Sequence, residues 1–193
     1  MTEDTQNARN RHARSQGIQV ALAVSLYGIS FGALAVALGF SVWQTMVLSL
    51  LMFSGASQFA FIGIVGTGGI AAAGAAIASA GLLGIRNGLY ALRMSPLVGP
   101  GFWKRALAGH LTVDESTAVA VAQGDPESSR HGFWATALAL YAGWNLATLV
   151  GALAGDAARD ARIDDRRNPG HRRQRRRDRV QRALRGAVGP AAR

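Results

Sequence analysis

The chain contains no cysteine among its 193 residues, which excludes disulfide scaffolds, thiolate metal sites and cysteine nucleophiles. Long stretches also lack charge. No Asp, Glu, Lys or Arg occurs between Ser15 and Ile85, a run of 71 residues, or between His131 and Gly155. A soluble core would interleave charged residues at the period of a helix or a strand. An apolar stretch of about 18 residues can already span a bilayer, so the sequence predicts an integral membrane protein.

The motifs of soluble enzymes are missing as well. The chain has no Walker A loop for ATP hydrolysis and no serine nucleophile elbow. Its four histidines stand apart and include no i, i+4 pair that could hold a metal ion: His12, His110, His131 and His171. We therefore predict that the protein is not an enzyme and that it has no catalytic residue, metal or cofactor.

Positive charge is concentrated at the C-terminal end. Residues 157–193 carry 13 Arg, 4 Asp and no Lys, so they supply +9 of the net charge of +10. Clustered Arg can bind nucleic acid or anionic lipid, and it can also arise when GC-rich DNA is read out of frame. The lack of Lys and the interspersed Asp favour the frameshift, and we predict no nucleic-acid partner. The predicted parts are a polar cytoplasmic leader (1–14), a transmembrane domain (15–156) and an Arg-rich disordered tail (157–193).

The predicted fold class is an all-α integral membrane protein, a bundle of about four to five apolar helical segments with one broken or re-entrant. The segments are 17–40, 42–66, 69–92, 113–123 and 132–154. Gly28 and Gly32 give the first segment a small face for close helix packing. The second segment is interrupted at residues 54–58. Pro96 and Pro100 are expected to end any helix that reaches them.

Basic residues predict the orientation. Three arginines of the leader place the N-terminus in the cytoplasm by the positive-inside bias: Arg9, Arg11 and Arg14. If the segment 42–66 crosses the membrane, three further basic residues would lie outside, against that bias: Arg93, Lys104 and Arg105. A re-entrant hairpin would return them to the cytoplasmic side, and such a hairpin is tolerated where it is buried in protein. We slightly favour the hairpin.

Polar groups in the broken segment are the first candidates for a substrate site. Ser54, Ser57 and Gln58 supply donors and acceptors, and Gly55 lets the backbone open. Transporters place substrates at such breaks, where freed N–H groups face carboxylates and freed C=O groups face cations. The alternative is hydrogen bonding between helices, worth about 0.6 kcal/mol per bond. The sequence favours neither interpretation.

Arg86 lies in an otherwise uncharged segment. A charged side chain at the membrane centre costs about 2.5–3.5 kcal/mol on insertion scales, so it is usually retained for function. Together with Asn87 and with Tyr90, one helical turn further on, Arg86 is a candidate clamp for the carboxylate of a substrate. The alternative is that the side chain reaches the interface from near the end of the segment.

Asp114 and Glu115 are the acidic candidates. They could pair with Arg86, or relay a proton or ion that is coupled to transport. The alternative is a capping box with Thr112 as N-cap and Glu115 at the third helical position. Asn145 in the last segment either lines the pathway or bonds across helices, and its spacing does not decide between these roles.

Several motifs resemble those of the AzlC-type branched-chain amino-acid permeases, and they occur in the same order over roughly residues 15–156. They are Tyr27-Gly28-Ile29-Ser30-Phe31-Gly32, Leu38-Gly39-Phe40-Ser41, Phe53-Ser54-Gly55-Ala56-Ser57-Gln58-Phe59, Ile85-Arg86-Asn87 before Leu89-Tyr90, and Leu111-Thr112 before Asp114-Glu115. The family's own binding residues are not carried over. The site residues given above rest on their polarity at membrane depth.

The resemblance implies a multi-pass secondary transporter of the bacterial inner membrane. It would export branched-chain amino acids such as valine, leucine and isoleucine, driven by an ion gradient, together with a small hydrophobic partner subunit. The resemblance also implies further apolar segments after residue 156, where the sequence of this chain becomes rich in Arg instead. An inactive, truncated permease and a non-transporting membrane scaffold are therefore the alternatives. The exact substrate, the coupling ion and the oligomeric state, including a homo-oligomer, stay open.

Overall fold

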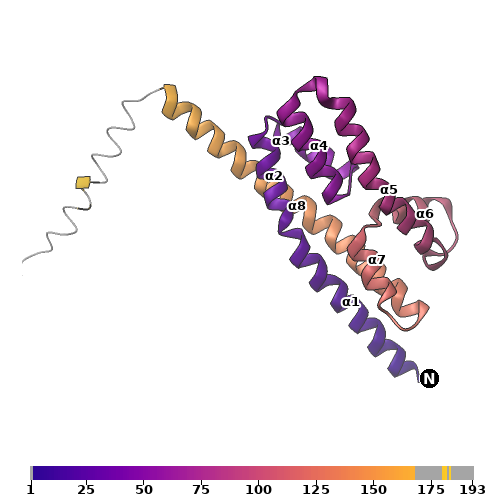
Figure 1. Cartoon of the computed structure of the whole chain (residues 1–193). Coiled ribbons are helices and arrows are strands. Elements are labelled where there is room, and N and C mark those ends of the chain that lie inside the picture. Colours follow the sequence, from indigo (N-terminus) through magenta and orange to yellow (C-terminus); the bar gives the residue numbers. More distant parts are fainter. Residues whose placement is uncertain (1, 168–179, 182, 184–193) are drawn as a thin grey trace, which may run out of the picture. The chain divides into compact units, whose positions relative to one another are not determined.

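The computed structural model describes residues 2–167, 180, 181 and 183, and the chain divides into two compact units, Met1–Asp156 and Ala157–Arg193. Most of the described residues are helical, with no strand among them. The elements are α1 (Glu3–Ser25), α2 (Tyr27–Ala37), α3 (Val42–Leu51), α4 (Gly55–Gly68), the 3-10 turn η1 (Ile70–Ala72), α5 (Ala73–Val98), α6 (Phe102–Leu111), α7 (Asp114–Val121) and α8 (Pro126–Arg167) (Figure 1).

Three stretches of the described chain are long and apolar enough to cross a membrane: Glu3–Ala37, Ile70–Val98 and Pro126–Asp164. The prediction of an all-α membrane protein is therefore confirmed. The first stretch joins α1 and α2 through Leu26, whose φ of −60° and ψ of −29° keep the chain in helical conformation across the boundary.

The helices α1 and α2 pack along α8 through a seam of glycines. A Cβ atom at Gly28 would lie 2.7 Å from the carbonyl oxygen of Trp144, and one at Gly32 would collide with the carbonyl of Thr148. The close packing predicted for these two glycines is thus confirmed. Near the other end of the seam, Gly17 lies against Thr136. Residue numbers therefore rise in the same direction along α1–α2 and along α8, so the two elements run parallel (Figure 1).

The long helix α5 runs in the opposite direction. Near its end, the carbonyl oxygen of Leu97 accepts a hydrogen bond of 3.1 Å from Nε of Arg130, close to the beginning of α8. Its middle, at Arg86, instead lines the same cavity as Leu140, further along α8. The end of α2 and the beginning of α5 therefore lie at the same end of the bundle.

The segment 42–66 is broken, as predicted, between α3 and α4. Ser41 caps α3: its Oγ accepts from the N–H of Gln44 at 3.1 Å, while the Gln44 side chain accepts from the N–H of Ser41 at 2.8 Å. The ten residues of α3 span only about 15 Å, half of a bilayer core. The helix α3 begins next to the end of α2, and α4 ends next to the beginning of α5. Because these two points lie at the same end of the bundle, the helix pair α3–α4 returns to the end at which it began.

The stretch 93–130 contains more helix than the sequence suggested. Pro96 was expected to end a helix, but it lies inside α5, two residues before the last residue of that helix. Proline is damaging chiefly in a helix interior, and here little helix follows it. The amphipathic helix α6 then forms over Phe102–Leu111, where no helix was predicted.

The predicted capping box at Thr112 and Glu115 is wrong. The N-cap of α7 is Val113, whose N–H donates to Oγ of Ser116 at 3.1 Å. The hydroxyl of Thr112 instead donates to the carbonyl of Ala108 at 2.6 Å, at the end of α6. Glu115, which becomes the second residue of α7, is free of a capping role.

Helix extends beyond the apolar segments at both ends of the domain. The leader is helical from Glu3 because it docks on the beginning of α8, where the side chain of Asn10 donates to Glu127 at 2.7 Å and accepts from Ser128 at 3.0 Å. At the other end α8 continues to Arg167, so residues 157–167 are described as helix, which Ala and Arg favour. The predicted disorder of residues 168–179, 182 and 184–193 lies outside the described residues.

Candidate functional site

A cavity of about 140 Å³ lies where the two interrupted helix pairs, α3–α4 and α6–α7, meet the three long elements. Its walls are formed by Val24, Phe53, Ser54, Gly55, Ala56, Arg86, Asn87, Val113, Asp114, Glu115, Leu140 and Trp144. Six of these twelve were candidates from the sequence: Ser54, Gly55, Arg86, Asn87, Asp114 and Glu115. The structure thus brings residues from three distant segments of the sequence to one wall.

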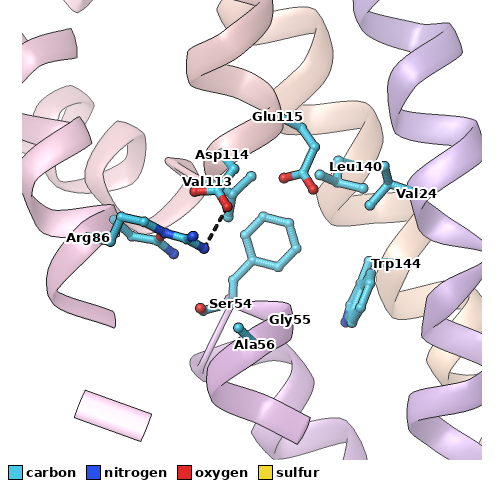
Figure 2. A pocket seen from close by; sticks show the side chains of 12 residues that line it. Val24, Ser54, Gly55, Ala56, Arg86, Val113, Asp114, Glu115, Leu140 and Trp144 are labelled. Carbon is cyan, nitrogen blue, oxygen red and sulfur yellow. Dashed lines mark ion pairs between the residues drawn. The ribbon is translucent and has the colours of Figure 1, made fainter. Parts of the chain in front are cut away.

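Arg86 and Asp114 form an ion pair at this wall (Figure 2), with 2.6 Å between Nη2 and Oδ2. Pairing with Arg86 was one of the two functional roles considered for Asp114. Arg86 is the fourteenth of the 26 residues of α5, so it lies at the middle of the helix rather than near an end. This position does not favour the interpretation that Arg86 reaches an interface. Both side chains are about half exposed, at 51% and 43%, so a ligand can reach them.

A second carboxylate and an unsatisfied oxygen add to the polar wall. The carboxylate of Glu115 points into the cavity between Asp114 and Leu140 (Figure 2). The Oδ1 atom of Asp114 is buried and has no hydrogen-bond partner within the described chain. Two carboxylates next to one guanidinium leave this wall with an excess of acceptors, which suits a cationic group.

The beginnings of two helices converge on the cavity. Ser54, the N-cap of α4, has extended backbone and makes no side-chain capping bond, so the first amides of α4 at Gly55 and Ala56 remain as donors. Asp114 begins α7. The N-terminal end of a helix carries partial positive charge, and α4 therefore offers a second anion-binding element beside Arg86.

The rest of the cavity is apolar. Val24 comes from α1, Phe53 from the break between α3 and α4, and Leu140 and Trp144 from α8. Trp144 also packs against the ring of Phe31 with 6.3 Å between the ring centroids. A ligand in this cavity would meet charge on one side and hydrocarbon on the other.

Ser57 and Gln58 do not line the cavity but hold its wall in place. The hydroxyl of Ser57 donates to the carbonyl of Ala80 in α5 at 2.9 Å. Gln58 is fully buried, and its Nε2 donates to the carbonyl of Met52, freed by the end of α3, at 2.7 Å. Interhelical hydrogen bonding was the alternative considered for these residues, and it is what their geometry shows.

Tyr90 and Asn145 are also absent from the cavity lining. Tyr90 lies one turn beyond Arg86 on α5, and Asn145 donates to the carbonyl of Tyr141 within α8 at 2.8 Å. Sequence reasoning missed the apolar wall, above all Val24, Leu140 and Trp144. Their residue types are ordinary for a membrane helix, so only the packing of α1 and α8 reveals them.

The family model described as "AzlC protein" matches residues 19–158, most of the chain. No curated protein and no solved structure matches the chain. The matched region contains every residue of the cavity wall, the whole of the stretch Ile70–Val98 and most of the two other long stretches. With 140 of its 193 residues covered, this helical membrane protein belongs to the AzlC family, a transport-related family of proteins.

Proposed function

We propose that this protein is a secondary transporter subunit that exports branched-chain amino acids across the bacterial inner membrane. The observation that supports this most directly is the Arg86–Asp114 ion pair at the wall of a mid-bundle cavity. Charged residues inside a membrane domain are costly and mark pathways for substrates or ions. The family membership supports a role in transport, while the substrate rests on the chemistry of the cavity and on the resemblance.

A zwitterionic amino acid fits between the two partners of this ion pair. Its carboxylate would replace Asp114 on the guanidinium of Arg86 and would also accept from the free amides at the beginning of α4. Its ammonium group would take the place of Arg86 between Asp114 and Glu115. When the ion pair opens, each of its two side chains pairs with the oppositely charged group of the ligand. Binding of the ligand therefore leaves no buried charge without a partner.

The apolar wall would select the side chain of the substrate. Val24, Leu140 and the ring of Trp144 lie opposite the polar wall and offer no charged group. A branched aliphatic side chain gains about 25 cal/mol for each Å² of apolar surface that it buries there. A charged or strongly polar side chain would lose hydration without a partner, so such substrates would be rejected.

We propose a cytoplasmic N-terminus. Seven of the eight basic residues in 1–156 are expected at the end of the bundle where α1 begins and α5 ends: Arg9, Arg11, Arg14, Arg93, Lys104, Arg105 and Arg130. The turns at the other end, residues 38–41 and 68–72, contain no Lys or Arg. The positive-inside bias therefore supports the re-entrant path of α3–α4 and a cytoplasmic position for the beginning of α1.

The proposal is tested by valine efflux from loaded cells. We expect efflux from cells that express the chain together with its small hydrophobic partner subunit, and a loss of at least tenfold with Arg86→Ala at equal membrane levels. Lys104→Ala is the matched control, because it removes an exposed basic residue that does not line the cavity, and it should leave efflux unchanged.

Three outcomes contradict the proposal. Efflux that is unchanged by Arg86→Ala would remove the proposed site. Absence of valine efflux from the wild-type chain with its partner subunit would favour a scaffold or an inactive permease. A lysine efflux as large as that of valine would show that the apolar wall does not select the substrate.

A further inference from the structure

The two halves of the membrane domain have the same order of elements. In the first half, a long element (α1–α2) is followed by a ten-residue helix, a break and a second short helix. In the second half, α5 is followed by α6, a break and α7. The two ten-residue helices begin at Val42 and Phe102 and end at Leu51 and Leu111, so both of their ends are 60 residues apart.

Local details repeat at the same spacing. Gly39 and Gly99, which follow the two long elements, both have positive φ angles, of 99° and 90°. Trp43 and Trp103 are the second residues of α3 and α6, and both are strongly exposed, at 73% and 82%. A glycine with positive φ followed four residues later by an exposed tryptophan is a specific coincidence, because neither feature is required by helix formation.

The packing between the halves is reciprocal. The second short helix of each half packs on the long element of the other half: α4 on α5, and α7 on α1. Ser57 of α4 donates to the carbonyl of Ala80 in α5 at 2.9 Å. At a different position, Gln123 just after α7 donates to Oε1 of Gln16 in α1 at 2.9 Å. Such an exchange of contacts is what a two-fold relationship between the halves produces.

The two halves run in opposite directions. Asn10 near the beginning of α1 and Leu97 near the end of α5 both bond to the first residues of α8, Asn10 to Glu127 and Leu97 to Arg130. The first long element therefore starts at the end of the bundle where the second one finishes. A two-fold axis that relates the two halves must therefore be perpendicular to the long helices, as in transporters built from inverted repeats.

The cavity lies where such an axis would pass. Its wall takes residues 53–56 from the first break and residues 113–115 from the second. Each long element also contributes, Val24 from α1 and Arg86 with Asn87 from α5. Substrate sites of inverted-repeat transporters are found at this place, at the interface between the repeats.

We infer that residues 17–121 form an inverted repeat whose two broken helix pairs enter the membrane from opposite faces. The two halves exchange conformations during transport, so that the cavity opens alternately past α3–α4 and past α6–α7. The repeat stands on the geometry alone, whereas the exchange rests on the proposed transport function. The partial positive charge at the beginning of each inner helix faces the cavity in both states.

The entry faces are tested with single cysteines, since the natural chain has none. The matched variants of the full chain are Trp43→Cys and Thr67→Cys in the first half, and Trp103→Cys and Ala122→Cys in the second. A membrane-impermeant maleimide should label the first two only from outside, and the last two only in inverted vesicles. Labelling after detergent solubilisation shows that every thiol is reactive. Gln44→Cys and Lys104→Cys replace the tryptophan variants if those do not insert.

Labelling of positions 43 and 67 from opposite faces would overturn the repeat, because α3–α4 would then cross the membrane. The exchange is tested with Ala56→Cys and Val113→Cys, one from each break. In vesicles in which the protein is transporting, both thiols should react with the maleimide from either face of the membrane. Reaction from a single face under every condition would overturn the exchange and leave a fixed, one-sided cavity. If valine slows neither reaction while the four entry positions behave as expected, the substrate proposed above fails and the repeat remains.

Discussion

The indole nitrogen of Trp144 donates a hydrogen bond of 3.0 Å to Oε1 of Gln58, joining α8 to the broken helix across 86 residues of sequence. The amide of Gln58 in turn donates to the carbonyl of Met52 at the end of α3. Trp144 also lines the cavity with its ring. One side chain therefore both shapes the site and orients the glutamine that stabilises the break.

We predict that Gln58→Leu destabilises the domain more than Trp144→Phe. The leucine leaves the indole N–H of Trp144 without a partner and removes one of the two bonds that the carbonyl of Met52 accepts, the other coming from the N–H of Ser54 at 2.8 Å. Each unsatisfied buried group costs about 1–3 kcal/mol. The phenylalanine removes a single bond, the one that Oε1 of Gln58 accepts, and keeps an apolar ring against Phe31. Thermal unfolding in detergent measures both changes, and equal midpoints for the two variants would contradict this role of Gln58.

The glycine seam should tolerate no side chain. Gly32→Leu would place its side chain on the carbonyl of Thr148 in α8, and overpacking of this kind costs typically about 1–3 kcal/mol and occasionally more. Gly74→Leu in α5 is the matched control, because nothing lies within 4 Å of its Cβ position. The fraction of monodisperse protein after extraction should fall for Gly32→Leu alone. A similar fall for both variants would point to an effect of leucine as such.

The ion pair of the cavity predicts a non-additive result. Asp114→Asn alone leaves the guanidinium of Arg86 without its partner, and Arg86→Gln alone leaves two carboxylates together. The double variant keeps the shape of residue 114 and a polar group at residue 86 and removes both charges of the ion pair, so its loss of stability should be smaller than the sum of the single losses. A double-mutant cycle from thermal unfolding measures this coupling. Strict additivity would show that the two groups do not interact in the membrane.

Asp125, in the turn before α8 and outside the three spans, predicts a pH dependence. The backbone N–H of Ser128 donates to its Oδ1 at 2.9 Å, and this bond is the main reason that the pKa of Asp125 falls to about 2 from its usual 3.8. A carboxyl group with a lowered pKa in the folded state stabilises the fold above pH 3.8. That contribution disappears as the pH falls through about 2.

The variant Asp125→Asn should therefore be less stable than the wild type at pH 6, and the difference should shrink between pH 4 and pH 2. The unfolding midpoint measured over this range provides the test. Glu3→Gln is the control, because it removes an exposed carboxylate near the beginning of α1. A difference that stays constant down to pH 2 would mean that the bonds of Asp125 do not depend on its charge.

The unit Met1–Asp156 should behave as the membrane domain without the tail. A stop codon after Asp156 removes thirteen Arg and four Asp, but none of the residues of the cavity wall. We expect the shortened chain to insert and to unfold at the same temperature as the full chain. A loss of insertion would assign a structural role to residues 157–193.

Some of this arrangement was readable from the sequence. Gly55 with its polar neighbours predicted the break before α4, because such residues are uncommon in an uncharged helix. The charges of Arg86 and Asp114 marked them as partners, because few charges occur at this depth. The roles of these residues in binding stay predictions. Their shared wall with Val24 and Leu140 could not be foreseen, because it depends on how α1 and α8 pack.

The remaining errors have local causes. The helix α6 was missed because Pro96 and Pro100 suggested irregular structure, whereas the chain turns at Gly99 and Gly101 and resumes as a helix. The repeat was missed because few residue types recur at a spacing of 60. What recurs is backbone geometry, and the positive φ of Gly39 and Gly99 is not visible in the sequence.

The unbroken course of α1 joins two distant regions mechanically. The helix runs without interruption from Glu3 to Ser25, so Asn10, held by Glu127 and Ser128, and Val24, at the cavity wall, belong to one stiff rod. Fourteen residues separate them, a lever arm of about 21 Å. A rotation of α1 about its axis at Asn10 would turn Val24 by the same angle. The hydrogen bonds of Asn10 therefore fix the direction in which the side chain of Val24 faces the cavity.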